Sequence, residues 1–177
     1  IAYLSYRGKP HCGGQGVYTR HLTKALADLG HSVTVLSGQP YPILDERVPL
    51  IKLPSLDLYN DHYPMRKARI WELKDRWDFL ELAVFNTGTF PEPLTFSFRA
   101  WDYLRNRQEQ FDLVHDNQSL GWGLVLIQNK VGLPVLSTIH HPITVDRRIE
   151  ITHSRTPWES FSKRRWYAFT KMQTRVA

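Results

Sequence analysis

The sequence of 177 residues has little cysteine: Cys12 stands alone, so no disulfide can form within the chain. Nothing argues for an oxidising compartment, and we expect a cytoplasmic protein. Long apolar runs are also missing, because the longest strongly apolar stretch, residues 121–127, is far shorter than the ~20 residues of a membrane-spanning helix. The chain starts without Met or a signal-peptide pattern, and its last helical pattern reaches Ala177 without a stop signal. We therefore expect a fragment of a longer protein.

Acidic residues are in the minority: 17 Asp and Glu stand against 23 Lys and Arg, which gives a net charge of +6. A basic chain suits phosphates, anionic sugars or an acidic membrane surface, and the charge alone does not choose among them. The length fits one domain, or one domain with part of a second. Since 42% of the residues are hydrophobic, a packed core is possible and wholesale disorder is excluded.

The first forty residues predict a strand, a helix and a second strand. Residues 1–6 are a short apolar run. Apolar residues then recur at three- and four-residue steps from Val17 to Leu29, and Gly30 ends this helical pattern. Residues 32–37 predict the second strand. Because such a crossover joins parallel strands and covers the sheet with helices, the sequence indicates an α/β fold.

The same alternation returns after residue 110. Residues 112–115 predict a buried strand, residues 120–131 a helix, and residues 135–139 another strand. A further strand at 48–53 would lie at the sheet edge, because Pro49 cannot donate a ladder hydrogen bond. We therefore expect a Rossmann-like, doubly wound, mostly parallel sheet with helices on both faces.

Residues of about 40–110 break this rhythm, and we interpret them as a variable insertion. Helical spacing predicts one helix over 65–80 and a second from about 96 to 110, and Pro91-Glu92-Pro93 indicates a loop between them. Residues 158–176 show helical spacing again.

Three loops of such a sheet should meet at its ligand-binding edge, outside the carboxyl ends of the strands: residues 7–16, 116–119 and 140–146. The first of these loops contains a glycine-rich turn directly before the predicted helix. Backbone N–H groups and the helix N-terminus can receive a phosphate there, although a tight turn without a ligand is the alternative. The glycine spacing fits neither the dinucleotide-binding pattern nor the Walker pattern.

The other two loops carry polar side chains. His140 and His141 follow the last strand, where an imidazole can donate a hydrogen bond or hold a charge, or can simply be satisfied by the backbone. Adjacent histidines on an extended chain point to opposite faces and do not form a metal pair, so we expect no metal site. Asp116, Asn117 and Gln118 offer hydroxyl-binding groups suited to a sugar, although the same residue types cap helices and form turns.

Basic and aromatic residues interleave from Arg147 to Phe169. Such a segment can lie on anionic lipid, contact nucleic acid, or form a core-facing helix with a solvated charged face. No nucleic-acid-binding motif accompanies the charge, so we expect no nucleic-acid partner.

Taken in order, these segments resemble one known family. The run His11-Cys12-Gly13-Gly14-Gln15-Gly16-Val17-Tyr18 and the later run Gly30-His31-Ser32-Val33-Thr34-Val35-Leu36 resemble the opening of glycosyltransferase family 4 enzymes, which have the GT-B fold. Phe111-Asp112-Leu113-Val114-His115 and Leu133-Pro134-Val135-Leu136-Ser137-Thr138-Ile139-His140 resemble two later strands of the same domain. The resemblance covers about 1–38 and 111–150.

The resemblance implies a transferase that moves a sugar from a UDP- or GDP-linked donor to a sugar or lipid-linked acceptor, with retention at the anomeric carbon and without a further cofactor. Two Rossmann-like domains would face each other across a cleft, and residues 1–177 would be the N-terminal, acceptor-binding one. His140 would contact the transferred sugar and support the reaction. The donor diphosphate would lie against Gly13, Gly14, Gln15 and Gly16, and further substrate contacts would come from Asp116, Asn117, Gln118, His141, Thr144 and Arg147.

The family's donor-binding domain carries two glutamates separated by seven residues, and no such pair occurs here. We therefore expect the C-terminal donor domain to be absent from this chain and the chain alone to be inactive. A lipid-linked acceptor would explain a peripheral contact with the inner face of a membrane. The alternative is a non-catalytic Rossmann or flavodoxin-like module that binds a phosphate-bearing ligand.

Overall fold

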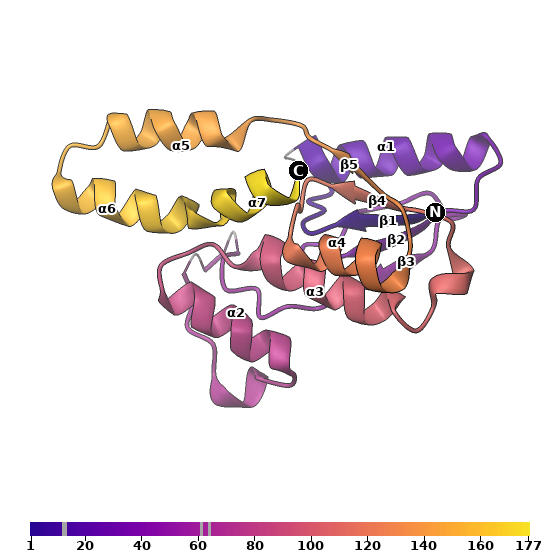
Figure 1. Cartoon of the computed structure of the whole chain (residues 1–177), viewed down its shortest axis with the longest axis horizontal. Coiled ribbons are helices and arrows are strands. Elements are labelled where there is room, and N and C mark those ends of the chain that lie inside the picture. Colours follow the sequence, from indigo (N-terminus) through magenta and orange to yellow (C-terminus); the bar gives the residue numbers. More distant parts are fainter. Residues whose placement is uncertain (12–13, 61, 64) are drawn as a thin grey trace.

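The computed structural model describes residues 1–11, 14–60, 62–63 and 65–177. Its centre is a five-stranded sheet in the order β3-β2-β1-β4-β5, in which every pair of neighbouring strands is parallel (Figure 1). The strands are β1 (Ala2–Ser5), β2 (Thr34–Ser37), β3 (Leu50–Lys52), β4 (Val114–Asn117) and β5 (Val135–Thr138). All five lie within predicted strands or overlap them, and the strand after Pro49 is at the sheet edge as expected.

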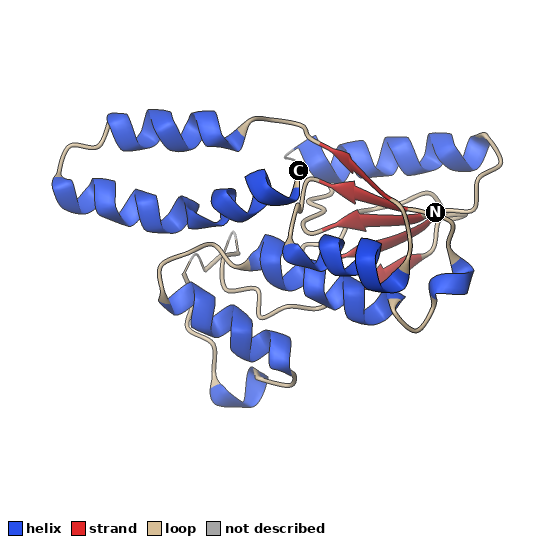
Figure 2. Ribbon diagram, viewed as in Figure 1, coloured by secondary structure: helices blue, strands red, loops and turns tan. Residues whose placement is uncertain are grey.

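Helices cover both faces of the sheet, with α1 on one face and α3 and α4 on the other, as Figure 2 shows. The predicted doubly wound α/β fold is therefore confirmed. The helices are α1 (Gly14–Asp28), α2 (Arg76–Asn86), α3 (Glu92–Leu104), α4 (Trp122–Leu126), α5 (Ile143–Thr152), α6 (Pro157–Trp166) and α7 (Thr170–Val176), with a π-helical turn η3 (Ile127–Val131) and 3-10 turns η1 (Ile70–Glu72), η2 (Gln108–Gln110) and η4 (Tyr167–Phe169).

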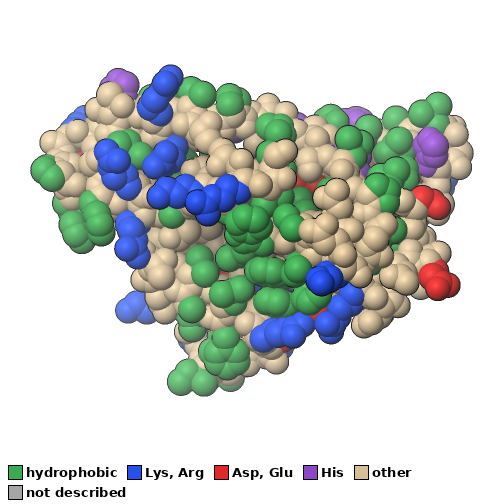
Figure 3. Space-filling view, viewed as in Figure 1, with side chains coloured by type: hydrophobic (Ala, Val, Ile, Leu, Met, Phe, Trp, Pro, Cys, Tyr) green, Lys and Arg blue, Asp and Glu red, His purple; other side chains and the backbone are tan. Residues whose placement is uncertain are grey.

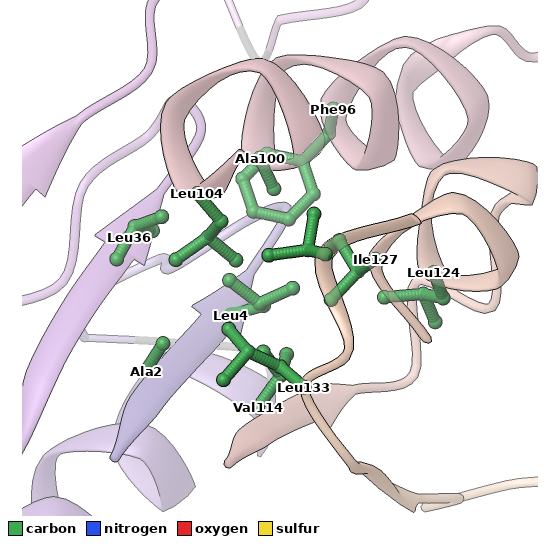
Figure 4. Packing of buried hydrophobic residues seen from close by; sticks show 11 residues of the cluster. Ala2, Leu4, Leu36, Phe96, Ala100, Leu104, Val114, Leu124, Ile127 and Leu133 are labelled. Atoms are coloured by element: carbon green, nitrogen blue, oxygen red, sulfur yellow. The ribbon is translucent and has the colours of Figure 1, made fainter. Parts of the chain in front are cut away.

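The alternation of side chains along β1 builds a core on each face. Ala2 and Leu4 belong to the buried cluster on the face that α3 and α4 cover, together with Phe96 and Ile127 (Figure 4). Tyr3 points the other way and packs under α1 in a cluster with Val33, Val35 and Val48. Full burial of one such large side chain stabilises the fold by about 1.5–3 kcal/mol, so these two layers fix the sheet between its helices.

Close contact between α3 and α4 requires glycine at position 123. A Cβ on Gly123 would lie 2.0 Å from the carbonyl oxygen of Ser97, and the Gly123 N–H donates to Ser97 Oγ at 3.0 Å. This contact fixes the start of α4 and with it the loop that leaves β4.

The insertion differs from its prediction in where its helices begin. The helix expected over 65–80 is wrong: α2 begins only at Arg76, because the Asp75 carboxylate caps it by accepting from the N–H groups of Trp77 and Asp78 at 2.7 and 2.9 Å. The loop expected at Pro91-Glu92-Pro93 is also wrong, since α3 starts at Glu92. Proline fits the first turn of a helix, where its missing N–H costs nothing.

A buried carboxylate ties the insertion together. Glu81 on α2 is fully buried, lies 3.3 Å from the Arg99 guanidinium on α3, and accepts from the Leu56 N–H at 3.1 Å. Burial raises the pKa of Glu81 to about 7, and the positive charge of Arg99 opposes that rise. These contacts hold the segment after β3 that leads to Tyr59.

The C-terminal segment is helical, as expected, but it is broken into pieces. Where residues 140–146 were expected to form a loop, α5 already begins at Ile143, and η4 interrupts the helical pattern between α6 and α7. Helices α5 and α6 form a hairpin that extends beyond the sheet, and α7 returns to pack on α4 (Figure 1). Within the part of the chain that the structure describes, no helix combines the length and the apolar character needed to span a bilayer.

Candidate functional site

The strand order places a topological switch point between β1 and β4. The chain leaves β1 toward β2 through α1 on one face and leaves β4 toward β5 through α4 on the other, so the two connections diverge. In open parallel sheets, ligands bind outside the carboxyl ends of the strands at such a point. The loops after β1, β4 and β5 meet there, as predicted.

The glycine-rich turn lies at the first turn of α1. Gly13 falls outside the described residues, and Gly14 is the first residue of the helix. A Cβ on Gly16 would lie 2.0 Å from the Lys9 carbonyl oxygen, so Gly16 allows the loop to pack on the helix. Among the described residues, none has an atom within 4 Å of a Cβ on Gly14, so on their side the backbone at Gly14 is open to an incoming group.

A pocket of about 270 Å³ lies against this turn and is lined by Arg7, Lys9, Gly14, Gln15 and Gly16. Two cationic side chains therefore share one pocket with the N-terminus of a 15-residue helix, whose dipole also favours an anion.

Arg7 is held in place by contacts with Glu92 and Tyr59. Its Nη1 lies 3.3 Å from the Glu92 carboxylate and donates to the Tyr59 carbonyl oxygen at 3.1 Å. Burial raises the pKa of Glu92 to about 8, and the nearby Arg7 guanidinium opposes that rise. Sequence reasoning missed Arg7 as a site residue. The sequence feature that could have pointed to Arg7 is its position: it is a basic residue two positions after a strand that ends at the ligand-binding edge of the sheet.

His140 follows β5 and turns its imidazole toward α1 and β4. Its Nε2 is hydrogen-bonded to Asn117 Oδ1, and its ring meets the Tyr18 ring edge-on at 4.6 Å between centroids. The His140 N–H donates to Gln118 Oε1 at 2.8 Å. Partial desolvation lowers the pKa of His140, which favours the neutral form of its imidazole.

Residues 116–119 were expected to form a loop, but Asp116 and Asn117 are the last two residues of β4 and only Gln118 and Ser119 follow it. Asp116, Asn117 and Gln118 are all buried, and each is hydrogen-bonded within the protein. The Asp116 carboxylate accepts from Ser119 Oγ and from the Leu120 N–H at 3.0 Å, and burial raises its pKa to about 6. Gln118 has a left-handed backbone (φ 59°), and its side chain also donates to the His141 carbonyl oxygen at 2.7 Å. Asn117 lies between Thr19 and His140. These side chains hold the loops after β4 and β5 together.

The other predicted substrate-binding residues, His141, Thr144 and Arg147, lie next to or within α5. His141 and Thr144 line a pocket of about 210 Å³ together with Gln118, and His141 Nε2 lies 2.7 Å from Asp146 Oδ2. Arg147 follows one turn further along α5, is half-buried, and is not among the described residues that line this pocket. Over the described part of the chain, no group of three His, Cys, Asp or Glu side chains is placed to hold a metal ion.

Comparison with known proteins identifies the family. The model of the family described as "Glycosyl transferase 4-like domain" matches residues 13–175. The chain belongs to this family. It is also 56% identical over 178 residues to the "MMP alpha-(1->4)-mannosyltransferase" of Mycolicibacterium hassiacum, an alignment that covers 100% of this chain and 43% of that relative. The chain therefore spans less than half the length of this glycosyltransferase relative. The resemblance to glycosyltransferase family 4 is confirmed, and the parallel sheet matches one half of a GT-B fold.

Proposed function

We propose that residues 1–177 form the N-terminal, acceptor-binding half of a retaining glycosyltransferase that takes a sugar from a nucleotide-sugar donor. The name of the relative suggests mannose as the sugar and an α-(1→4) linkage as the product. The donor would be UDP- or GDP-linked, and the acceptor a sugar or a lipid-linked sugar. A second, C-terminal domain would bind the nucleotide across a cleft, which agrees with a relative of more than twice this length.

The observation that carries this proposal is the pocket at the glycine turn. When the bond between sugar and diphosphate breaks, negative charge grows on the departing phosphate, and donors already aimed at that charge lower the barrier. The backbone at Gly14, the N-terminus of α1 and the Arg7 guanidinium lie around one pocket. These groups supply positive charge and N–H donors to the phosphate without the need for a metal ion.

His140 and the loops around it would receive the sugars. A neutral imidazole at the end of β5 suits contact with sugar hydroxyls, which both donate and accept hydrogen bonds. His141, Thr144 and Gln118 line the neighbouring pocket, where we propose contacts with the acceptor. Asp116, Asn117 and Arg147 would support these contacts mainly by holding the loops and α5 in place.

The test is transfer by the full-length protein, with UDP- and GDP-linked hexoses offered in turn and the anomeric configuration of the product read by NMR. We expect one donor to be used with retention. Gly14→Val should abolish transfer without unfolding the protein, because the side chain would project into the open space that we assign to the diphosphate. A protein that binds nucleotide sugars but transfers none would favour the alternative, a non-catalytic phosphate-ligand module.

We further propose that the α5–α6 hairpin makes a peripheral contact with an acidic membrane surface on the cytoplasmic side. Residues 143–177 contain eight Lys and Arg against three Asp and Glu, and so carry +5 of the chain's net charge of +6. Figure 3 shows Lys and Arg side chains gathered over these helices. Trp158 and Phe161 are exposed and stacked on each other at 5.6 Å between ring centroids. Basic residues beside exposed aromatic rings suit an interfacial helix.

A further inference from the structure

A series of hydrogen bonds through the buried side chains of Thr19 and Asn117 connects the glycine turn to His140. Thr19 Oγ1 on α1 donates to the Gln15 carbonyl oxygen at 2.7 Å. Asn117 Nδ2 at the end of β4 donates to Thr19 Oγ1 at 3.2 Å and reaches the same Gln15 oxygen at 3.5 Å. Asn117 Oδ1 then meets His140 Nε2. Thr19 and Asn117 are both fully buried, so water does not compete for the bond between them, whereas Gln15 is half-buried and His140 lies at the exposed end.

The donor and acceptor atoms of these hydrogen bonds allow only one orientation of the Asn117 amide and one placement of the hydrogens. A carbonyl oxygen only accepts, so the Thr19 hydroxyl hydrogen goes to Gln15, and Thr19 Oγ1 is left to accept. The Asn117 side chain must therefore turn its NH₂ group toward Thr19 and Gln15, because the reverse orientation would bring two acceptors against its oxygen. Its Oδ1 then faces His140. An amide oxygen only accepts, so His140 Nε2 must carry a hydrogen.

We propose that Asn117 is a positioning residue that holds neutral His140 as the Nε2–H tautomer, so that Nδ1 is the ring atom left to accept a hydrogen bond from a substrate hydroxyl. The structural part of this inference stands on the hydrogen-bond chain alone. Its catalytic part rests on the proposed function. His140 would then act as an acceptor toward a sugar, and protonation of Nδ1 would convert that acceptor into a donor.

The surroundings of His140 agree with a neutral ring. Because side chains alternate along β4, His115 and Asn117 face α1. The Asp116 carboxylate lies on the other face of the sheet, where it accepts a hydrogen bond from Ser119 Oγ. Among the described residues, the titratable groups near His140 on this face include Tyr18 on α1, His115 on β4 and Tyr3 on β1, whose ring lies 4.9 Å from that of His115 between centroids. His141 pairs with Asp146 on α5. Burial lowers the pKa of His115 as well, and the charge of His140 contributes to that lowering.

The first experiment reads the tautomer without any assay of transfer. Long-range ¹H–¹⁵N spectra of the full-length protein, labelled at histidine nitrogens, distinguish the two neutral tautomers, and His140→Gln assigns the signal. We expect the Nε2–H pattern in the parent protein. In Thr19→Val, which removes the hydroxyl that anchors the Asn117 amide, we expect a mixture of tautomers. An Nδ1–H pattern in the parent protein would overturn the proposal.

A charge change at position 117 supplies the second measurement. In Asn117→Asp a carboxylate would face Nε2 and stabilise the imidazolium, so the pKa of His140 should rise by about one to three pH units. The matched control is Asn129→Asp, which adds the same charge at an exposed position on η3, at the opposite end of the sheet. A titration of His140 that is equal in Asn117→Asp and in the control would contradict the proposed contact.

The pH profile of transfer tests the catalytic part. Because protonated Nδ1 can no longer accept, the acid limb of kcat should move to higher pH in Asn117→Asp by the same shift that NMR records, and should stay in place in Asn129→Asp. If the NMR titration moves and the acid limb does not, the acceptor role of His140 is wrong while the tautomer assignment holds. If the protein transfers no sugar at all, the proposed function fails, and the spectra still decide the tautomer.

Discussion

Arg7 Nη1 lies 3.3 Å from Glu92 Oε2, and this contact joins the loop after β1 to the first turn of α3 across 85 residues of sequence. The pair fixes the guanidinium beside the glycine turn. Since burial raises the pKa of Glu92 to about 8, the carboxyl group can remain protonated near neutral pH when its partner is removed.

Arg7→Gln should therefore keep the fold near neutral pH but slow transfer. Loss of one preorganised donor to a developing negative charge costs on the order of 10²-fold in kcat. The measurement is kcat of the full-length enzyme together with its thermal unfolding. Lys24→Gln is the control, because Lys24 is an exposed cation that pairs with Asp28 on α1. An Arg7→Gln enzyme as fast as this control would remove Arg7 from the site.

The two described glycines of the turn should respond differently to alanine. In Gly16→Ala the new Cβ would lie 2.0 Å from a backbone oxygen, so the loop or the helix must shift, at a cost of about 1–3 kcal/mol in the free energy of unfolding. In Gly14→Ala the Cβ meets open space, and the free energy of unfolding should change by less than about 1 kcal/mol. Denaturant titration of both variants measures the difference. Equal destabilisation would contradict the distinct roles assigned to them.

The strands and the ligand edge were predictable because their signals are local. Short strand-like segments at 1–6, 32–37, 112–115 and 135–139 recur with helical patterns between them, and parallel strands that are joined by such crossovers end at one edge. The meeting of His140 with the β4 loop follows from that topology. The hydrogen bonds through Thr19 do not, because they depend on how α1 is rotated on the sheet, which the sequence pattern does not specify.

The insertion was harder to predict because its signals conflict. Ile70 stands at helical spacing from Leu73 and Trp77, yet its side chain is exposed, so no core contact stabilises a helix there, and the Asp75 cap sets the start instead. The prolines on either side of Glu92 looked like a loop and in fact open α3. Arg7 was missed for the same reason, because its carboxylate partner Glu92 lies in the insertion.

Asp116 should make the stability of the protein depend on pH. Its pKa rises from the ordinary 3.8 to about 6 because burial disfavours the charged form. Between these two values the folded protein keeps a proton that the unfolded chain has lost. The free energy of unfolding should therefore fall as the pH rises through this window. In Asp116→Asn this fall should be smaller, which urea titrations across the window can measure. An identical slope in both proteins would contradict the burial argument.

The α5–α6 hairpin should bind vesicles that contain anionic lipid and leave neutral vesicles unbound. Basic residues near such a surface contribute about 1 kcal/mol each, and salt screens this attraction. Co-sedimentation of the full-length protein with phosphatidylcholine vesicles, with and without phosphatidylglycerol, should show binding only to the second kind and a loss of binding at high salt. Trp158→Ser should weaken binding to the anionic vesicles, because it removes the exposed ring that would enter the lipid interface. Trp71→Ser is the matched control, since the two rings are 73% and 75% exposed on different parts of the molecule. Equal binding to both kinds of vesicle, or equal weakening by both substitutions, would exclude the hairpin as a membrane contact.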